Sequence, residues 1–172
     1  MSIRLFRIGI VLMMAIAGGA LPAAAQEPTP IDTHRDWHTY RFEENGKLVC
    51  YMATQPTKEE GDYTQRGDVY LMVTHRPAED SRSVVSVITG YTYGPDSEVD
   101  VVIGDSRFSL FTAENTAWAE DEAIDREMVA AMRAGSSMTV KGVSNRGTVT
   151  TDTYSLLGFT AAYNEINRVC GV

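Results

Sequence analysis

Residues 146–170, RGTVTTDTYSLLGFTAAYNEINRVC, carry the clearest structural pattern in this 172-residue chain. Threonine, valine and tyrosine dominate residues 148–154, which favours a β-strand. Over residues 156–169 apolar side chains recur every three or four positions, which predicts an amphipathic helix. Ser155 suits the N-cap, because its hydroxyl can accept a hydrogen bond from a free amide of the first turn. We expect the apolar face of this helix to be buried together with Cys170.

The preceding residues predict further short strands joined by tight turns. Asn45-Gly46 and Gly104-Asp105 are pairs typical of β-hairpins. A second helix over 122–134 is indicated by Asp121 as its cap and Gly135 at its end. Residues 55–68 are polar and predict a surface loop. The expected fold is mainly β: an antiparallel β-sandwich or curled barrel of about eight strands with the two helices 122–134 and 156–169.

The N-terminus has the features of a secretory signal peptide over residues 1–25. Arg4 and Arg7 form a basic start, residues 8–21 form a short apolar run, and Ala23–Ala25 offer small residues for cleavage. An uncleaved membrane anchor is the competing interpretation, but the run is shorter than the roughly 20 residues that a membrane-spanning helix needs. We therefore expect a periplasmic or secreted protein with no membrane span after cleavage.

The remainder is long enough for one domain with a single core, which we assign to residues 36–172. Residues 26–35 are polar and contain two prolines, so we predict an N-terminal linker there. After residue 25 the chain has 13 basic and 23 acidic residues, a net charge of −10, and the basic residues are scattered. This balance disfavours nucleic acid and anionic membrane surfaces as partners.

Cys50 and Cys170 are the two cysteines of the chain. An oxidising compartment favours a disulfide between them, and two buried free thiols are the alternative. A bridge would tie the last helix to the second predicted strand.

Candidate reactive groups are present, but none has a specific motif. His34 and His38, with Asp32 and Asp36, place four possible metal ligands close together, yet they precede or begin a strand and lack a third fixed partner, so we predict no metal site. A nucleophilic triad can be named from Ser144, His75 and Asp152, but there is no G-x-S-x-G motif to mark an activated serine.

Two other groups have competing structural and functional interpretations. Arg66-Gly67-Asp68 spells the tripeptide that integrins recognise and is a possible interaction site, although the same residues suit a turn into the next strand. Four further polar residues could form a cluster near a helix N-terminus, where an anion would be favoured. The alternative is that their charges only interact favourably with the dipoles at the helix ends. The residues of that cluster would be Arg133, Arg146, Asp152 and Tyr154.

A set of motifs spread over the chain resembles the invasion-associated locus B family of exported bacterial proteins. They are Trp37, Cys50, Arg66-Gly67, the run from Val73 to Pro77, Gly90-Tyr91, Trp118, Met132 with Gly135, Ser144-x-Arg146-Gly147-Thr148, and the segment from Asp152 through Tyr154-Ser155-Leu156 and Gly158-Phe159 to Ala162. The resemblance implies an export signal, a small mostly β domain and a role in host-cell invasion or colonisation. It implies no catalytic residue and no cofactor.

The function expected from these observations is non-enzymatic. We expect an exported protein that binds an as yet unknown protein partner at the envelope or the host surface. A small periplasmic hydrolase or ligand-binding domain is the alternative, and a deep pocket with a histidine next to a serine would favour it.

Overall fold

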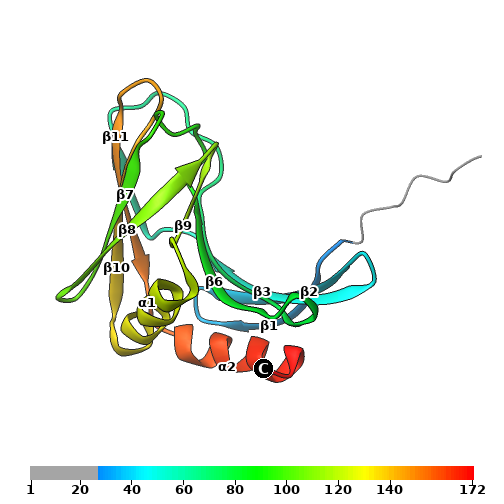
Figure 1. Ribbon diagram of the computed structural model, residues 1–172. Helices are drawn as coiled ribbons and strands as arrows, with labels where there is room; N and C mark the ends of the chain where they lie inside the picture. The colour runs from blue at the N-terminus through cyan, green and yellow to red at the C-terminus, as the bar shows by residue number, and fades with distance from the viewer. Residues whose placement is uncertain (1–26) are drawn as a thin grey trace, which may run out of the picture.

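One antiparallel β-sheet and two α-helices form the fold (Figure 1). The computed structural model describes residues 27–172, so the predicted signal peptide lies outside the described residues. Within this range the strand order is β1-β2-β3-β5-β6-β9-β8-β7-β10-β11-β4. β1 pairs with β2 alone and β4 with β11 alone, which leaves the sheet open at both edges.

The strands are short and follow one another closely. Their bounds are β1 Thr29–His34, β2 Trp37–Glu44, β3 Lys47–Thr54, β4 Lys58–Gly61, β5 Tyr70–Arg76, β6 Ser81–Ile88, β7 Glu98–Ile103, β8 Ser106–Ala113, β9 Thr116–Trp118, β10 Ser137–Val143 and β11 Val149–Ser155. The helices are α1 Glu122–Ala134 and α2 Phe159–Cys170, and a 3-10 turn, η1, covers Pro77–Glu79.

The prediction of a mainly β protein with two helices is confirmed. The part of the chain that the structure describes has eleven strands rather than about eight, and they form one curled sheet that does not close. The linker predicted for residues 26–35 is wrong over Thr29–His34, because this segment pairs with β2 as an edge strand. Likewise, Lys58–Gly61 of the predicted loop pairs with β11 as the opposite edge. Both edges carry charges or prolines, which discourage pairing with other chains.

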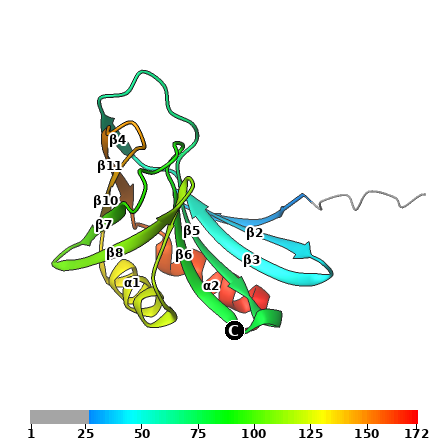
Figure 2. The ribbon, with the colours of Figure 1, turned by 45° about the horizontal axis from the view of Figure 1, so that its top comes forward.

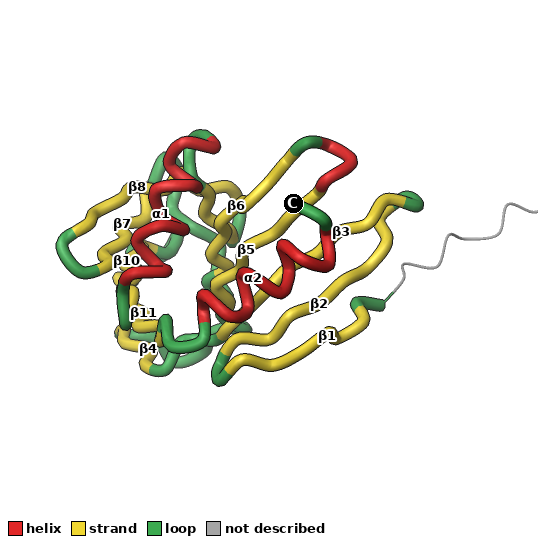
Figure 3. The backbone as a smooth tube through the Cα atoms, turned by 90° about the horizontal axis from the view of Figure 1, so that it is seen from below, coloured by secondary structure: helices red, strands yellow, loops and turns green. Residues whose placement is uncertain are grey.

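The sheet bends sharply into two wings (Figures 1 and 2). One wing contains β1, β2, β3, β5 and β6, and the other contains β7, β8, β10 and β11. α2 lies along one face of the first wing, and Figure 3, a view from below, shows it in front of these strands and running in nearly the same direction. α1 lies in the angle between the wings, against β6. The helices therefore cover the inner face of the bend and leave the opposite face of the first wing open.

Local sequence signals account for the turns and for α1. Asn45 and Gly46 both have positive φ, 53° and 74°, as a tight two-residue hairpin requires. Asp121 caps α1 as predicted: its carboxylate accepts hydrogen bonds from the N–H groups of Ala123 and Ile124. The predicted bounds of α1 agree with the structure.

The predicted start of α2 is wrong by about one turn. β11 continues to Ser155, and the helix begins at Phe159 with Gly158 at its N-cap. Gly158 has a φ of 97°, and a Cβ there would collide with the carbonyl oxygen of His34. The Ser155 hydroxyl instead accepts a hydrogen bond from the Leu157 N–H, 3.3 Å away, in the turn before the helix.

α2 is held against the first wing by aromatic packing and by a covalent bond. The rings of Trp37 and Phe159 meet edge to face with centroids 5.1 Å apart. The Trp37 indole N–H donates to the main-chain oxygen of Ser155 at 3.0 Å. The predicted disulfide is confirmed: Cys50 of β3 bonds to Cys170 at the end of α2, with 6.0 Å between the α-carbons.

Removing this disulfide should destabilise the fold strongly. The bridge spans 120 residues of sequence, and in the chain-entropy account a loop of that length contributes about 5 kcal/mol. We expect the double variant Cys50→Ala, Cys170→Ala to lose about 3–5 kcal/mol of unfolding free energy in urea titrations. Reduction of the wild-type protein should give a similar loss. A change below about 1 kcal/mol in both cases would contradict the role assigned to the bridge.

Asp125 is a buried carboxylate between α1 and β6. Its Oδ1 accepts a hydrogen bond of 2.8 Å from the Val85 N–H, and the residue is 5% exposed. Burial raises the pKa of Asp125 from 3.8 to about 6, and the hydrogen bond from Val85 offsets this only in part. Because the folded state binds this proton more tightly than the unfolded state, the contribution of Asp125 to stability is present below about pH 4 and is lost as the pH rises to about 6.

Asp125→Asn should therefore stabilise the protein at neutral pH. The amide keeps an acceptor for Val85 and removes the buried charge, so we expect a gain of about 1–2 kcal/mol at pH 7 that disappears near pH 4. Thermal unfolding across this pH range measures the effect. The exposed control Asp100→Asn should show no such pH dependence. An Asp125→Asn variant less stable than wild type at pH 7 would disprove this reasoning.

Candidate functional site

Every second side chain of the strands in the first wing points to the open face, which is the face opposite α2. In β3, Cys50 and Met52 point toward α2, so Tyr51 and Ala53 point to the opposite face. The same alternation places Tyr70 and Met72 of β5 on the open face. No element of the described chain packs over them.

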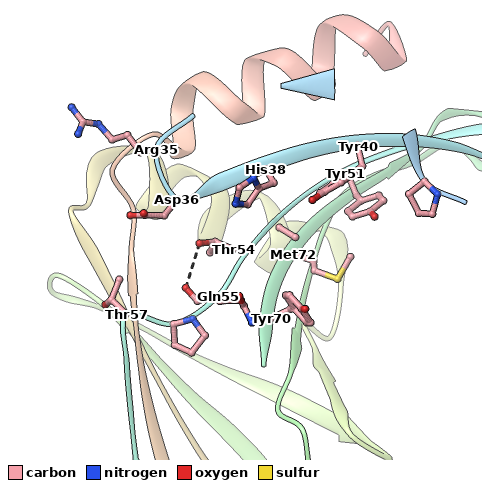
Figure 4. Close-up of a pocket in the computed structure, with 13 residues that line it drawn as sticks. Arg35, Asp36, His38, Tyr40, Tyr51, Thr54, Gln55, Thr57, Tyr70 and Met72 are labelled. Atoms are coloured by element: carbon pink, nitrogen blue, oxygen red, sulfur yellow. Dashed lines mark hydrogen bonds between the residues drawn. The ribbon is translucent and has the colours of Figure 1, made fainter. Parts of the chain in front are cut away.

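A groove of about 760 Å³ lies on this face (Figure 4). We call it the tyrosine groove. It is lined by Pro28, Arg35, Asp36, His38, Tyr40, Tyr51, Ala53, Thr54, Gln55, Pro56, Thr57, Tyr70 and Met72. Aromatic and apolar side chains from β2, β3 and β5 form one end, and polar groups of the turn 35–36 and of residues 55–57 form the other.

The tyrosines give the groove a rigid aromatic floor. Tyr40 and Tyr51 stack across β2 and β3 with centroids 5.0 Å apart, and Phe42 packs edge to face on Tyr51. Burial, with a smaller effect of the Tyr40 hydroxyl, raises the pKa of Tyr51, so this phenol keeps its proton. Among the described residues, the hydroxyls of Tyr40, Tyr51 and Tyr70 have no side-chain or main-chain partner, which leaves them free to bind another molecule.

An apolar surface continues from the groove across the sheet. Strand register places six side chains in one row on the same side of the sheet, one per strand from β2 in the first wing, across the bend, to β8 in the second: His38, Ala53, Met72, Ser86, Trp118 and Phe111. We call this set the cross-strand row. Trp118 and Phe111 pair at its far end, with ring centroids 5.9 Å apart, and Phe111 is 48% exposed.

A second, more polar pocket of about 640 Å³ lies among the loops at the other end of the molecule. Its floor is Arg66, whose guanidinium donates to both carboxylate oxygens of Asp152, at 2.7 and 2.6 Å, and to the main-chain oxygen of Thr89. The Arg66 side chain is 3% exposed and lies between the rings of Tyr63 and Tyr91. The Glu59 carboxylate lies a further 3.5 Å from the guanidinium, so the charge of Arg66 is already paired within the protein.

This geometry bears on the two interpretations of Arg66-Gly67-Asp68. Gly67 and Asp68 are exposed, but the arginine side chain is inside the protein. Integrin-type recognition needs an accessible arginine, so the burial of Arg66 supports the structural interpretation of this tripeptide. Its role is structural: Arg66 joins the loop before β5 to β11.

The histidines and aspartates near the N-terminus do not form a metal site. His34 pairs in register with Trp37, whereas His38 pairs with Thr33, so the two histidines lie on opposite faces of the β1–β2 ribbon. Within residues 27–172, no group of three potential ligands converges.

The residues of the nucleophilic triad named from the sequence are also separate. The His75 Nδ1 accepts from the Ser83 N–H at 2.9 Å, so Nε2 carries the proton that it donates to Asn167 Oδ1 at 2.8 Å. The Ser144 hydroxyl accepts from the N–H groups of Arg146 and Thr148, and Asp152 holds Arg66. Burial lowers the pKa of His75, which keeps this imidazole neutral as a link between β5 and α2.

The polar cluster proposed around Asp152 is not formed either. Arg133 stacks over the ring of Tyr163, 5.7 Å from its centroid, and Arg146 lies in an exposed turn. The sequence did point to Asp152, but its partner is Arg66, 86 residues away. The tyrosine groove was missed, because it depends on register among strands that no local pattern specifies.

Removing one member of the Arg66–Asp152 pair should destabilise the protein much more than removing both. Arg66→Met or Asp152→Asn leaves a buried charge without a partner, for which we expect a loss of about 3–5 kcal/mol in urea unfolding. The double variant Arg66→Met, Asp152→Leu should lose less than either single variant, because no unpaired buried charge remains. Arg168→Met, at the exposed Arg168–Glu165 pair, is the control and should change stability little. Additive losses would show that the buried pair is not coupled.

The lengths of the helices and comparisons with known proteins add to this description. No helix in the described range 27–172 is long and apolar enough to span a membrane. A comparison with curated protein sequences finds no significant match. A crystal structure of invasion associated protein b from Bartonella henselae matches with a TM-score of 0.56 and 19% identity, covering 80% of this chain and 95% of that chain, and so shares the fold.

The sequence comparison is more specific than the structural one. Residues 37–167 match the family described as invasion associated locus B (IalB) protein, which agrees with the resemblance found in the sequence motifs. This range includes β2 to β11 and most of α2, hence both strands that carry the stacked tyrosines. The chain therefore belongs to the invasion associated locus B family.

Proposed function

We propose that this protein is exported and acts without catalysis, by binding another protein at the bacterial envelope or the host surface during host interaction or colonisation. The observation that carries the proposal is the tyrosine groove with its free hydroxyls on an uncovered sheet face. Tyrosine and tryptophan are enriched at protein interfaces, because one side chain supplies both apolar area and a hydrogen bond.

Export is supported by the sequence and by the disulfide. Residues 1–25 have the pattern of a signal peptide, and the Cys50–Cys170 bridge is of a kind that persists in oxidising compartments. The family match and the Bartonella structure, an invasion associated protein by its description, support the connection to a host.

The chemistry of the groove favours binding over catalysis. Of its two threonines, Thr54 donates to the main-chain oxygen of Gln55 and Thr57 to that of Thr153, so neither hydroxyl faces a base. His38 lines the groove, and its Nδ1 lies 3.1 Å from the hydroxyl of Thr33, a residue that is not part of the groove lining. A hydrolase would need a nucleophile within hydrogen-bond reach of such a base.

Changing the groove should abolish partner binding without unfolding the protein. We expect Tyr51→Ser with Tyr70→Ser to reduce, by about tenfold or more, the amount of specific partner retained from envelope fractions or host-cell surface extracts by the immobilised, oxidised protein. Quantitative mass spectrometry of the retained proteins measures this. Leu157→Ser is the control: this residue is 54% exposed, lies in the turn before α2 and is not part of the groove lining.

The proposal is wrong if the double variant, folded by circular dichroism, retains the same proteins in the same amounts as wild type. Complementation of a gene deletion gives a second test: the Leu157→Ser protein should restore host-cell entry or colonisation, and the groove variant should not.

A further inference from the structure

We propose that the tyrosine groove and the cross-strand row bind an extended, proline-containing segment of a partner protein, which lies across the strands from the Tyr40–Tyr51 stack to the Trp118–Phe111 pair. This inference rests on the proposed binding function and names the chemistry of its ligand. Four features of the open face support it.

The first feature is the absence of charge along the path. In the described chain, the cross-strand row contains no charged side chain beyond the titratable imidazole of His38, and the neighbouring row Tyr40, Tyr51, Thr74 and Val84 contains none. Charges lie outside these rows: Arg35 and Asp36 at the polar end of the groove, and beyond the other side Glu44 and Arg76, which pair with each other at 3.2 Å. The face therefore complements an uncharged segment, because a charged one would be desolvated without a partner.

The second feature is the kind of polar group that the floor presents. The phenolic hydroxyls of Tyr40, Tyr51 and Tyr70 can donate to carbonyl oxygens. A polyproline II chain has no internal hydrogen bonds and, at its prolines, no N–H group, so it needs donors more than acceptors. A glycan would also need several acceptors for its hydroxyls, and the one carboxylate of the groove, Asp36, lies at its polar end.

The third feature is a proline of the chain itself. Pro28 immediately precedes β1 and lines the groove with Tyr40 and Tyr51, and Pro56 lines it from the loop after β3. The aromatic floor thus already borders extended proline-containing backbone, the kind of ligand that aromatic grooves elsewhere recognise. A bound partner segment would continue this proline-containing backbone across the neighbouring strands.

The fourth feature is length. The cross-strand row covers six adjacent strands, five spacings of about 4.8 Å each, or roughly 24 Å. A polyproline II chain rises about 3.1 Å per residue, so about eight residues would reach from one aromatic pair to the other. A segment half as long would reach only one pair.

Titration of the full oxidised chain with synthetic peptides tests the proposal. The probes are an eight-residue alternating proline–alanine peptide, the corresponding four-residue peptide, an eight-residue glycine–serine peptide and a neutral linear oligosaccharide. Binding is followed by calorimetry and by the fluorescence of Trp118, which lies at the far end of the row. We expect the eight-residue proline peptide to bind at least about tenfold more tightly than the glycine–serine peptide and the oligosaccharide.

Matched variants locate the site. Tyr51→Ala should weaken binding of both proline peptides about tenfold, whereas Trp118→Ala should weaken only the longer one; Leu157→Ala should affect neither. Tyr51→Phe, which keeps the ring and removes the hydroxyl, should give a partial loss and guards against a folding defect. Equal binding of proline and glycine–serine peptides, preference for the oligosaccharide, or insensitivity to both aromatic substitutions would overturn the proposal.

The two sets of experiments also distinguish an error in the proposed ligand class from an error in the proposed binding function. If the groove variants lose their envelope or host partner while the proline peptide fails to bind, the ligand class is wrong and the binding function stands. If partner retention does not depend on the groove, the binding function proposed for this face is itself wrong.

Discussion

The docking of α2 on one face of the first wing is the interaction on which the rest of the structure depends. Trp37 packs against Phe159, His75 bonds to Asn167, and Cys50 is joined to Cys170, so contacts from three strands hold one helix. A short amphipathic helix is marginal alone and gains its stability from such packing. Because α2 occupies one face only, the other face of β2, β3 and β5 remains available to a partner.

The two ends of the molecule use polar groups differently. At the loop end, Arg66 and Asp152 pair with each other in the interior, which fixes the loop before β5. At the open face, tyrosine hydroxyls have no partner within the described chain and are close to solvent. A buried ion pair is costly when broken, whereas an exposed phenol can exchange water for a ligand at little cost. The structural ion pair and the proposed binding face are thus separated in space.

Local signals in the sequence predicted local structure well. Asp121 and Gly135 gave the bounds of α1, Asn45-Gly46 gave a hairpin, and the oxidising compartment suggested the disulfide. The errors involve long-range contacts. The start of α2 moves to Gly158 because Trp37, 118 residues before Ser155, holds the intervening turn. β1 exists only because β2 pairs with it. The groove likewise requires the register of β2, β3 and β5, and no motif within a single strand predicts that register.

Tyrosine footprinting is the most direct test of the claim that α2 covers one face of the first wing and that the opposite face binds a partner. The oxidised protein is iodinated briefly, alone and with its retained partner, and labelled tyrosines are quantified by mass spectrometry. The account predicts that Tyr40, Tyr51 and Tyr70 react in the free protein and are protected in the complex, while the interior Tyr93 and Tyr154 remain unlabelled in both. Rapid labelling of Tyr154 in the free protein, or unchanged labelling of Tyr51 on partner binding, would contradict it.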